Sequence, residues 1–129
     1  MKLLDTSVAV DHLRGFDPAT SLLRSLVREG EPVGASELTR FELLVGVRPD
    51  EHATLERFFL ALEWVSVTQE ISRRAGVYAR TYRCSHTGIG AVDYLIAATA
   101  SALGADLLTS NVRHFPMFDD LQAPYDYPV

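Results

Sequence analysis

Hydrophobic and polar positions along the chain follow two periods, one typical of short strands and one typical of amphipathic helices. Short apolar runs predict four strands, with a fifth expected near the C-terminus. They are Lys2 to Leu4, Pro32 to Ala35, Trp64 to Val67 and Asp106 to Thr109, with the last near Leu121 to Tyr125. Because helical segments separate these runs, we expect right-handed βαβ crossovers and an α/β fold. The predicted architecture is an α/β/α sandwich around a central, mostly parallel sheet.

Glycines, prolines and capping residues mark the ends of the predicted helices. The helices are expected at about residues 6–13, 18–30, 37–46, 51–62, 71–83 and 93–103. Ser36 and Asp50 are predicted N-caps, because their side-chain oxygens can accept a backbone N–H of the first turn. The helix after Ser36 carries the apolar residues Leu38, Phe41, Leu44 and Val45.

Four side chains with oxygen ligands, Asp5, Glu42, Asp93 and Asn111, lie beside predicted strand ends or in helices. Asp5 and Asn111 follow apolar strands, Asp93 opens a helix, and Glu42 lies in the helix after the second strand. Ligands of parallel α/β sheets bind at the carboxyl ends of strands. Carboxylate and amide oxygens are ligands that Mg²⁺ and Mn²⁺ prefer. The sequence therefore predicts a metal site made by Asp5, Glu42 and Asp93, with Asn111 beside it and Thr6 and Ser7 in support.

Each of these residues also has a purely structural interpretation. Asp5 and Asp93 could cap their own helices, and Asn111 is a common turn residue. Glu42 lies between Phe41 and Leu43, where a buried carboxylate would need a polar partner, but it could also lie on an exposed turn. Capping and metal binding are compatible, so both interpretations stay open for Asp5 and Asp93.

Composition narrows the class of protein. A chain of 129 residues predicts one domain, residues 1–129, and no apolar run reaches the roughly 18 to 20 residues that span a membrane. The lone Cys84 excludes an internal disulfide and fits a reducing cytoplasm. A net charge of −5 argues against bulk nucleic-acid binding. Arginines nevertheless gather at Arg73, Arg74, Arg80 and Arg83, and Arg113 follows Asn111; the first group is most simply a solvated helix face.

Four stretches of the chain resemble the PIN-domain ribonucleases, in particular the VapC-type toxins of toxin–antitoxin pairs. They are Leu3 to Ser7, Ser36 to Leu43, Gly90 to Ala100 and Leu108 to Phe115. The first stretch alone is weak evidence, but the order and spacing of all four agree with the family. The similarity covers nearly the whole chain.

The resemblance implies a PIN fold and a metal-dependent endoribonuclease that uses Mg²⁺, with Mn²⁺ as a substitute. It identifies Asp5, Glu42 and Asp93 as the acidic metal-site trio. Many family members carry aspartate where this chain has Asn111, a variant also common among VapC-like proteins. A homodimer, an RNA substrate and a VapB-type antitoxin whose DNA-binding half autoregulates the operon are also implied. Arg113 would support the site.

Other functions fit the residues less well. A phosphoryl-transfer enzyme with an aspartate at the first strand end needs a lysine, and Lys2, the only one, is at the wrong end of that strand. Gly88-Ile89-Gly90 lacks the third glycine of a dinucleotide site, and the four histidines with Cys84 lack the ligand spacing of a zinc site. The main alternative is an interaction protein with a PIN fold that has lost catalysis.

Overall fold

A four-stranded parallel sheet forms the centre of the computed structural model, which describes residues 1–128. The strands are β1 (Lys2–Leu4), β2 (Val33–Ser36), β3 (Glu63–Val65) and β4 (Asp106–Leu108), in the order β3-β2-β1-β4. Leu3 pairs with Gly34 on one side and with Leu107 on the other. The fold is therefore the predicted α/β sandwich with a parallel sheet.

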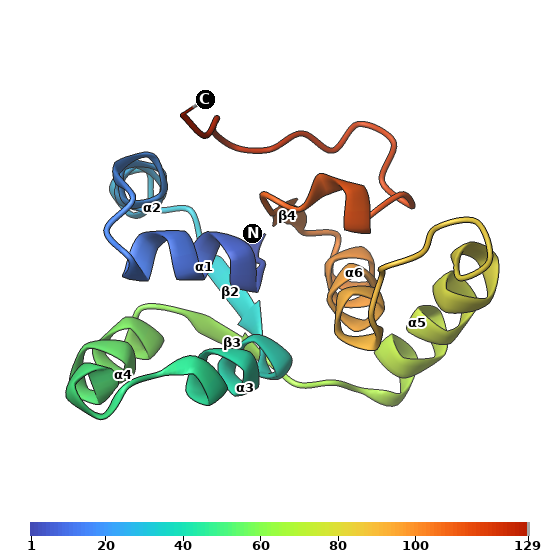
Figure 1. Ribbon diagram of the computed structural model, residues 1–129, viewed down its shortest axis with the longest axis horizontal. Coiled ribbons are helices and arrows are strands. Elements are labelled where there is room, and N and C mark those ends of the chain that lie inside the picture. Colours follow the sequence, from blue (N-terminus) through green and yellow to red (C-terminus); the bar gives the residue numbers. More distant parts are fainter. Residues whose placement is uncertain (129) are drawn as a thin grey trace.

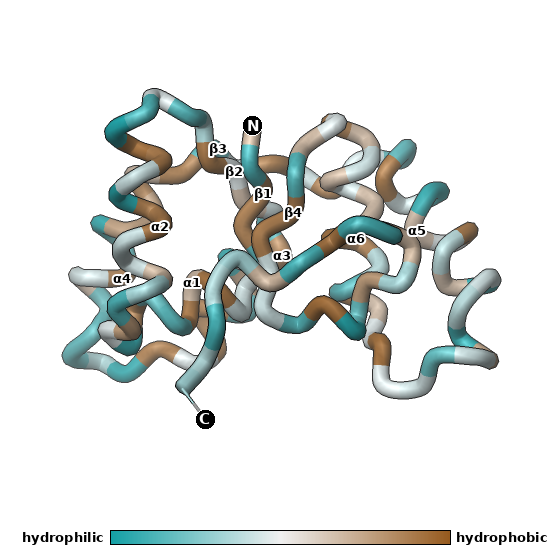
Figure 2. The backbone as a smooth tube through the Cα atoms, turned by 90° about the horizontal axis from the view of Figure 1, so that it is seen from above, coloured by the Kyte–Doolittle hydropathy of each residue, from teal (hydrophilic) through white to brown (hydrophobic). Residues whose placement is uncertain are grey.

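Helices cover both faces of the sheet (Figure 1). The helices α1 (Thr6–Leu13), α2 (Asp17–Arg28), α3 (Glu37–Gly46) and α4 (His52–Leu60) lie on one side, and α5 (Gln69–Tyr82) and α6 (Ala91–Leu103) lie on the other. Successive strand residues point to opposite faces. Leu4 accordingly packs with Val8, Leu26 and Phe59, whereas Leu3 packs with Ile96 and Phe115. In Figure 2, β1 and β4 are largely hydrophobic in the middle of the molecule.

Two helix starts differ from the sequence prediction. Asp50 is not an N-cap; it lies within the 3₁₀ helix η1 (Pro49–Glu51), where Glu51 Oε1 accepts the Arg48 N–H at 3.0 Å. The last helix begins at Ala91, two residues before the predicted Asp93, and Gly90 is its N-cap. The N-cap predicted at Ser36 is confirmed, since its hydroxyl accepts the Leu38 N–H.

The predicted strand from Leu121 to Tyr125 is wrong. After the 3₁₀ helix η2 (Val112–His114), residues 115–128 form no helix or strand, and this C-terminal segment returns across the molecule toward α1 and α2 (Figure 1). Side chains attach it there. Tyr125 and Tyr127 both donate hydrogen bonds to Asp11 Oδ2, the first at 2.6 Å, and both rings pack on Phe16.

We expect Tyr125→Phe to lower the free energy of unfolding by about 1 to 2 kcal/mol, because a half-buried carboxylate loses a hydrogen-bond donor. Burial and then the bond to Asp11 raise the pKa of Tyr125 above its ordinary 10.0. The folded protein holds that proton more tightly, so this stabilisation is complete below pH 10 and is lost as the pH rises above it. Urea unfolding at pH 7 measures the effect. The control Tyr127→Phe alters a ring that is 48% exposed, and it should cost less.

Candidate functional site

The candidate residues lie at the carboxyl edge of the sheet, where β1 and β4 run side by side. The Asp5 N–H donates to Leu108 O at 2.9 Å, which extends the pairing of the two strands by one residue. The chain leads from β1 through two helices to β2 on one side, and β4 is the neighbour on the other side. Parallel sheets bind ligands at such a switch point.

Asp5 is buried, with 4% of its surface exposed, and its carboxylate is held by two hydroxyl groups. Ser7 Oγ donates to Asp5 Oδ2 at 2.8 Å, and Thr109 Oγ1 donates to the same oxygen at 2.7 Å. Asp5 is the N-cap residue of α1 by position, but its side chain accepts no capping bond from that helix. The capping interpretation of this side chain is therefore wrong.

Thr109 is a site residue that the sequence analysis did not single out. It is fully buried, and besides donating to Asp5 its hydroxyl accepts the Asn111 N–H at 3.0 Å. Ser7 Oγ likewise accepts the Ser110 N–H at 3.1 Å. The available signal was its position directly after β4, whose register against β1 places it beside Asp5.

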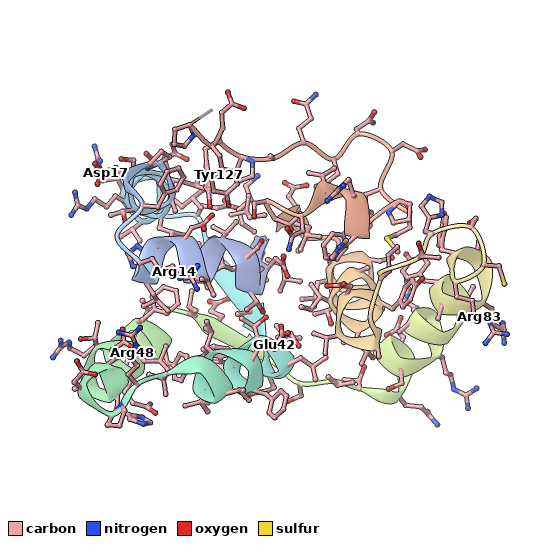
Figure 3. All side chains as sticks on the ribbon, viewed as in Figure 1. Arg14, Asp17, Glu42, Arg48, Arg83 and Tyr127 are labelled. Carbon is pink, nitrogen blue, oxygen red and sulfur yellow. The ribbon has the colours of Figure 1, made fainter. Side chains whose placement is uncertain are left out.

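Glu42 lies on α3 and contacts Thr6, the residue that follows Asp5. Thr6 Oγ1 donates to Glu42 Oε1 at 2.6 Å, and Thr39 Oγ1 lies 3.3 Å from the same Thr6 hydroxyl. The half-buried carboxylate thus has the polar partner that the sequence analysis required. Figure 3 shows Glu42 on α3, near the middle of the molecule.

The apolar residues noted on this helix are mostly not in the core. Phe41 is 61% and Val45 71% exposed, and Leu44 is also exposed. The buried side of α3 consists of Thr39 and Leu43 instead. This rotation follows from the polar contact of Thr39 and Glu42 with Thr6, which turns that face of the helix toward α1.

Asp93 is the third residue of α6, and its Oδ2 has two neighbours. The Gly90 N–H donates to it at 3.3 Å, and His114 Nδ1 lies 3.0 Å away. Asp93 therefore does help to cap its own helix. Burial raises the pKa of Asp93 above its ordinary value; the bond from Gly90 and the nearby His114 oppose this rise, and the charge of Asp5 adds to it. Asp5 and Asp93 are thus close enough to repel each other.

Asn111 and Arg113 are less involved than the three carboxylates. Asn111 precedes η2, and its side chain is exposed and caps no helix. Only its backbone N–H joins the network, through Thr109. Arg113 is exposed on η2. A direct role for either side chain stays a prediction.

The three carboxylates share one arrangement. In each, a single oxygen (Asp5 Oδ2, Glu42 Oε1 and Asp93 Oδ2) has protein neighbours, and within residues 1–128 no hydrogen bond engages the other oxygen. Free carboxylate oxygens are suitable ligands for a hard divalent cation. The donor chemistry fits Mg²⁺. Over the same residues, however, no three His, Cys, Asp or Glu side chains converge closely enough to enclose an ion as they stand, so ligation stays a prediction.

Phosphoryl-transfer enzymes with an aspartate after the first strand need a nearby lysine, and this edge of the sheet has none among the described residues. Lys2 lies at the opposite end of β1, where its Nζ is 2.8 Å from Asp106 Oδ2.

None of the helices in residues 1–128 has the length and apolar character that a membrane span requires.

A family model described as PIN domain matches residues 2–121 of the chain. The chain belongs to the PIN-domain family. Ribonuclease VapC19 of Mycobacterium tuberculosis (strain ATCC 25618 / H37Rv) is 62% identical over 125 residues, which are 97% of this chain and 100% of the relative. Together these matches confirm the resemblance to VapC proteins that the four sequence stretches indicated.

Solved structures of toxin–antitoxin complexes have the same fold. The toxin–antitoxin complex from Klebsiella pneumoniae has a chain with a TM-score of 0.79 and 24% identity, over 98% of this chain and 100% of that one. VapBC-1 from nontypeable Haemophilus influenzae gives a TM-score of 0.76 and 25% identity, over 95% of each chain. The sandwich seen here is therefore the PIN fold.

We expect Asp93→Asn to raise the melting temperature of the metal-free PIN domain at pH 7. A carboxyl group whose pKa is raised on folding holds its proton more tightly in the folded state. Its destabilising effect grows as the pH rises from 3.8 through the higher folded value, and it is complete above that. Asparagine keeps the shape and an acceptor oxygen but removes the charge. Thermal unfolding between pH 3 and 7 should show a difference that disappears at the acid end.

Asp106→Asn is the matched control, because the hydrogen bond and charge of Lys2 lower the pKa of Asp106. Loss of the Asp106 charge in this variant should not raise the melting temperature at pH 7. Equal melting temperatures for wild type and Asp93→Asn would mean that the contacts from Gly90 and His114 compensate fully for burial and repulsion.

Proposed function

We propose that this protein is an endoribonuclease that acts as the toxin of a type II toxin–antitoxin pair. The observation that carries the proposal is the set of three carboxylates, each with one oxygen held by the protein and one left free, at the switch point of a PIN fold. The relative at 62% identity is named a ribonuclease, which supports the same activity.

In this proposal Asp5, Glu42 and Asp93 hold Mg²⁺ or Mn²⁺ through their free oxygens. The bound ion would neutralise charge on the RNA phosphate and lower the pKa of the attacking water. Ser7 and Thr109 fix the orientation of Asp5, and Thr6 fixes that of Glu42. The exposed Arg113 can pair with a phosphate oxygen. The resemblance to the PIN-domain family is the reason to include Asn111 in the site.

The alternative is a PIN-fold interaction protein without catalysis. It gives no reason for a buried carboxyl side chain at Asp5, although a buried acidic group without a cationic partner is costly in a protein interior. Retention of all three acidic residues with a free oxygen on each favours the enzyme.

We propose that the partner is a VapB-type antitoxin, which binds a groove that is lined in part by Glu42 of the candidate site. The groove has a volume of about 310 Å³ and lies between α1, α3 and the start of α4. Its lining includes the apolar Leu13, Leu43 and Val47, and the acidic Glu42, Asp50 and Glu51. An apolar segment carrying an arginine complements such a groove, since a guanidinium group fits a carboxylate in bidentate fashion.

Among the apolar residues of α1 and α2, Leu13 lines this groove. Val8 and Leu26 are buried in the core instead, and Leu22 packs against that core. Arg14, which directly follows α1, and Glu42 on α3 both line the groove, and Figure 3 shows Arg14 above and Glu42 below.

We also propose that the protein acts in the cytoplasm and forms a homodimer. The exposed thiol of Cys84 is consistent with a reducing compartment. The apolar side chains that α3 exposes, Phe41, Leu44 and Val45, give a dimer a surface to bury.

We expect RNA cleavage to require Mg²⁺ or Mn²⁺ and to fall at least about 100-fold in Asp5→Asn and in Asp93→Asn, because each change removes one charge from the ion's ligands. Cleavage of total RNA by the purified variants, with and without EDTA, measures this. Asp106→Asn is the control, since Asp106 lies at the other edge of the sheet. Wild-type rates in either site variant, or full activity after chelation, would contradict the proposed site.

We expect Gly46→Phe to weaken antitoxin binding at least about tenfold, because the new ring fills the groove. An added Cβ at Gly46 meets nothing within 4 Å, so the fold should tolerate the change. Gly76→Phe on α5 is the matched control, at a glycine with equally open surroundings outside the groove. Titration with the protein encoded by the adjacent small gene measures both. Unchanged affinity of Gly46→Phe would exclude this groove.

A further inference from the structure

His114 lies against Asp93, and this contact has no role in the function proposed for the carboxylates. Its ring nitrogen Nδ1 is 3.0 Å from Asp93 Oδ2, and this nitrogen is buried although the ring as a whole is partly exposed. Within residues 1–128 it has no aligned hydrogen-bond partner. A buried nitrogen without a partner destabilises the fold, and a small rotation of the ring onto the carboxylate removes that cost.

The backbone holds this ring in place. The His114 N–H donates to Asn111 O at 2.9 Å within η2, and the next residue, Phe115, is 1% exposed in the core beside Leu3 and Ile96. The backbone of His114 is therefore held by η2 and Phe115, which keeps the imidazole within reach of Asp93.

Asp93 otherwise has weaker support than the other two carboxylates. Hydroxyl groups hold Asp5 at 2.7 and 2.8 Å and Glu42 at 2.6 Å, whereas the Gly90 N–H approaches Asp93 Oδ2 only to 3.3 Å. The Gly90 bond alone leaves the carboxylate free to turn about its last torsion angle. A second contact on the same oxygen restricts that rotation.

We propose that His114 is a positioning residue for Asp93: its Nδ1–H donates to Oδ2, restricts the rotation of the carboxylate and leaves Oδ1 free to hold a metal ion. This inference rests on the proposed function, because it concerns the orientation of a ligand for that ion. Partners that orient metal ligands typically contribute 10- to 100-fold to metal affinity.

The test compares His114→Asn and His114→Leu with wild type. Asparagine carries an amide N–H near the position of Nδ1, and leucine fills a similar volume without a donor. Titration with Mn²⁺, followed by the electron paramagnetic resonance signal of the free ion, gives the dissociation constants. We expect His114→Leu to bind Mn²⁺ roughly tenfold more weakly, and His114→Asn to stay within about threefold of wild type. Wild-type affinity in His114→Leu, or an equal loss in both variants, overturns the inference.

A measurement on the wild-type protein keeps the inference testable if His114→Leu does not fold. Long-range ¹H–¹⁵N correlation spectra report which ring nitrogen carries the proton, and we expect a proton on Nδ1. A neutral ring protonated only at Nε2 overturns the inference. The variant Asp93→Asn separates the role of His114 from the metal site itself. If Asp93→Asn loses Mn²⁺ binding and His114→Leu keeps it, only the role of His114 is refuted. A wild-type protein that binds no Mn²⁺ refutes the proposed function and this inference together.

Discussion

The burial of the Asp5 carboxylate is the constraint on which the rest of the site depends. A charged group that is almost fully buried needs hydrogen-bond donors. Ser7 provides one from the first turn of α1, and Thr109 provides the other from the end of β4. The same hydroxyl groups accept the N–H groups of Ser110 and Asn111. The network that satisfies Asp5 therefore also sets the path of the chain after β4, and with it the location of η2 and His114.

Electrostatics then determine what such a site attracts. The burial of Asp93 and the charge of Asp5 both raise the pKa of Asp93, so the metal-free site carries unfavourable charge at neutral pH. A divalent cation relieves this repulsion, and so does a guanidinium group from a partner. The carboxylates that would bind a cation therefore lower the stability of the metal-free fold, a common relation where charged groups are gathered for binding.

The sequence predicted the sheet well because its strands are short apolar runs between clear helix signals. Leu3 and Leu4 pack on opposite faces of β1, as alternation requires. Phe41 and Val45 illustrate the limit, since an apolar residue on a helix does not reveal whether its face meets the core or solvent. The C-terminal segment was missed because it is attached by tyrosine side chains to Asp11, about a hundred residues earlier, a contact without local periodicity.

The same reasoning separates the site residues that could be named in advance from those that could not. Asp5, Glu42 and Asp93 were recognisable by charge, position and family motif. Thr109 and His114 act through the orientation of those carboxylates, and threonine after a strand or histidine in a turn is too common to single out. Their roles depend on the register of β4 against β1 and on the anchoring of Phe115, which are three-dimensional facts.

Glu42 connects the two halves of the proposed function. It contributes to the carboxylate site through Thr6, and it also lines the end of the groove proposed for the antitoxin. A partner arginine paired with Glu42 and an ion bound by Glu42 would compete for the same oxygens. By thermodynamic linkage, each ligand then lowers the affinity for the other by the same factor. Under this proposal, inhibition would need no change of conformation, because competition at one shared side chain would couple antitoxin binding to loss of the bound ion.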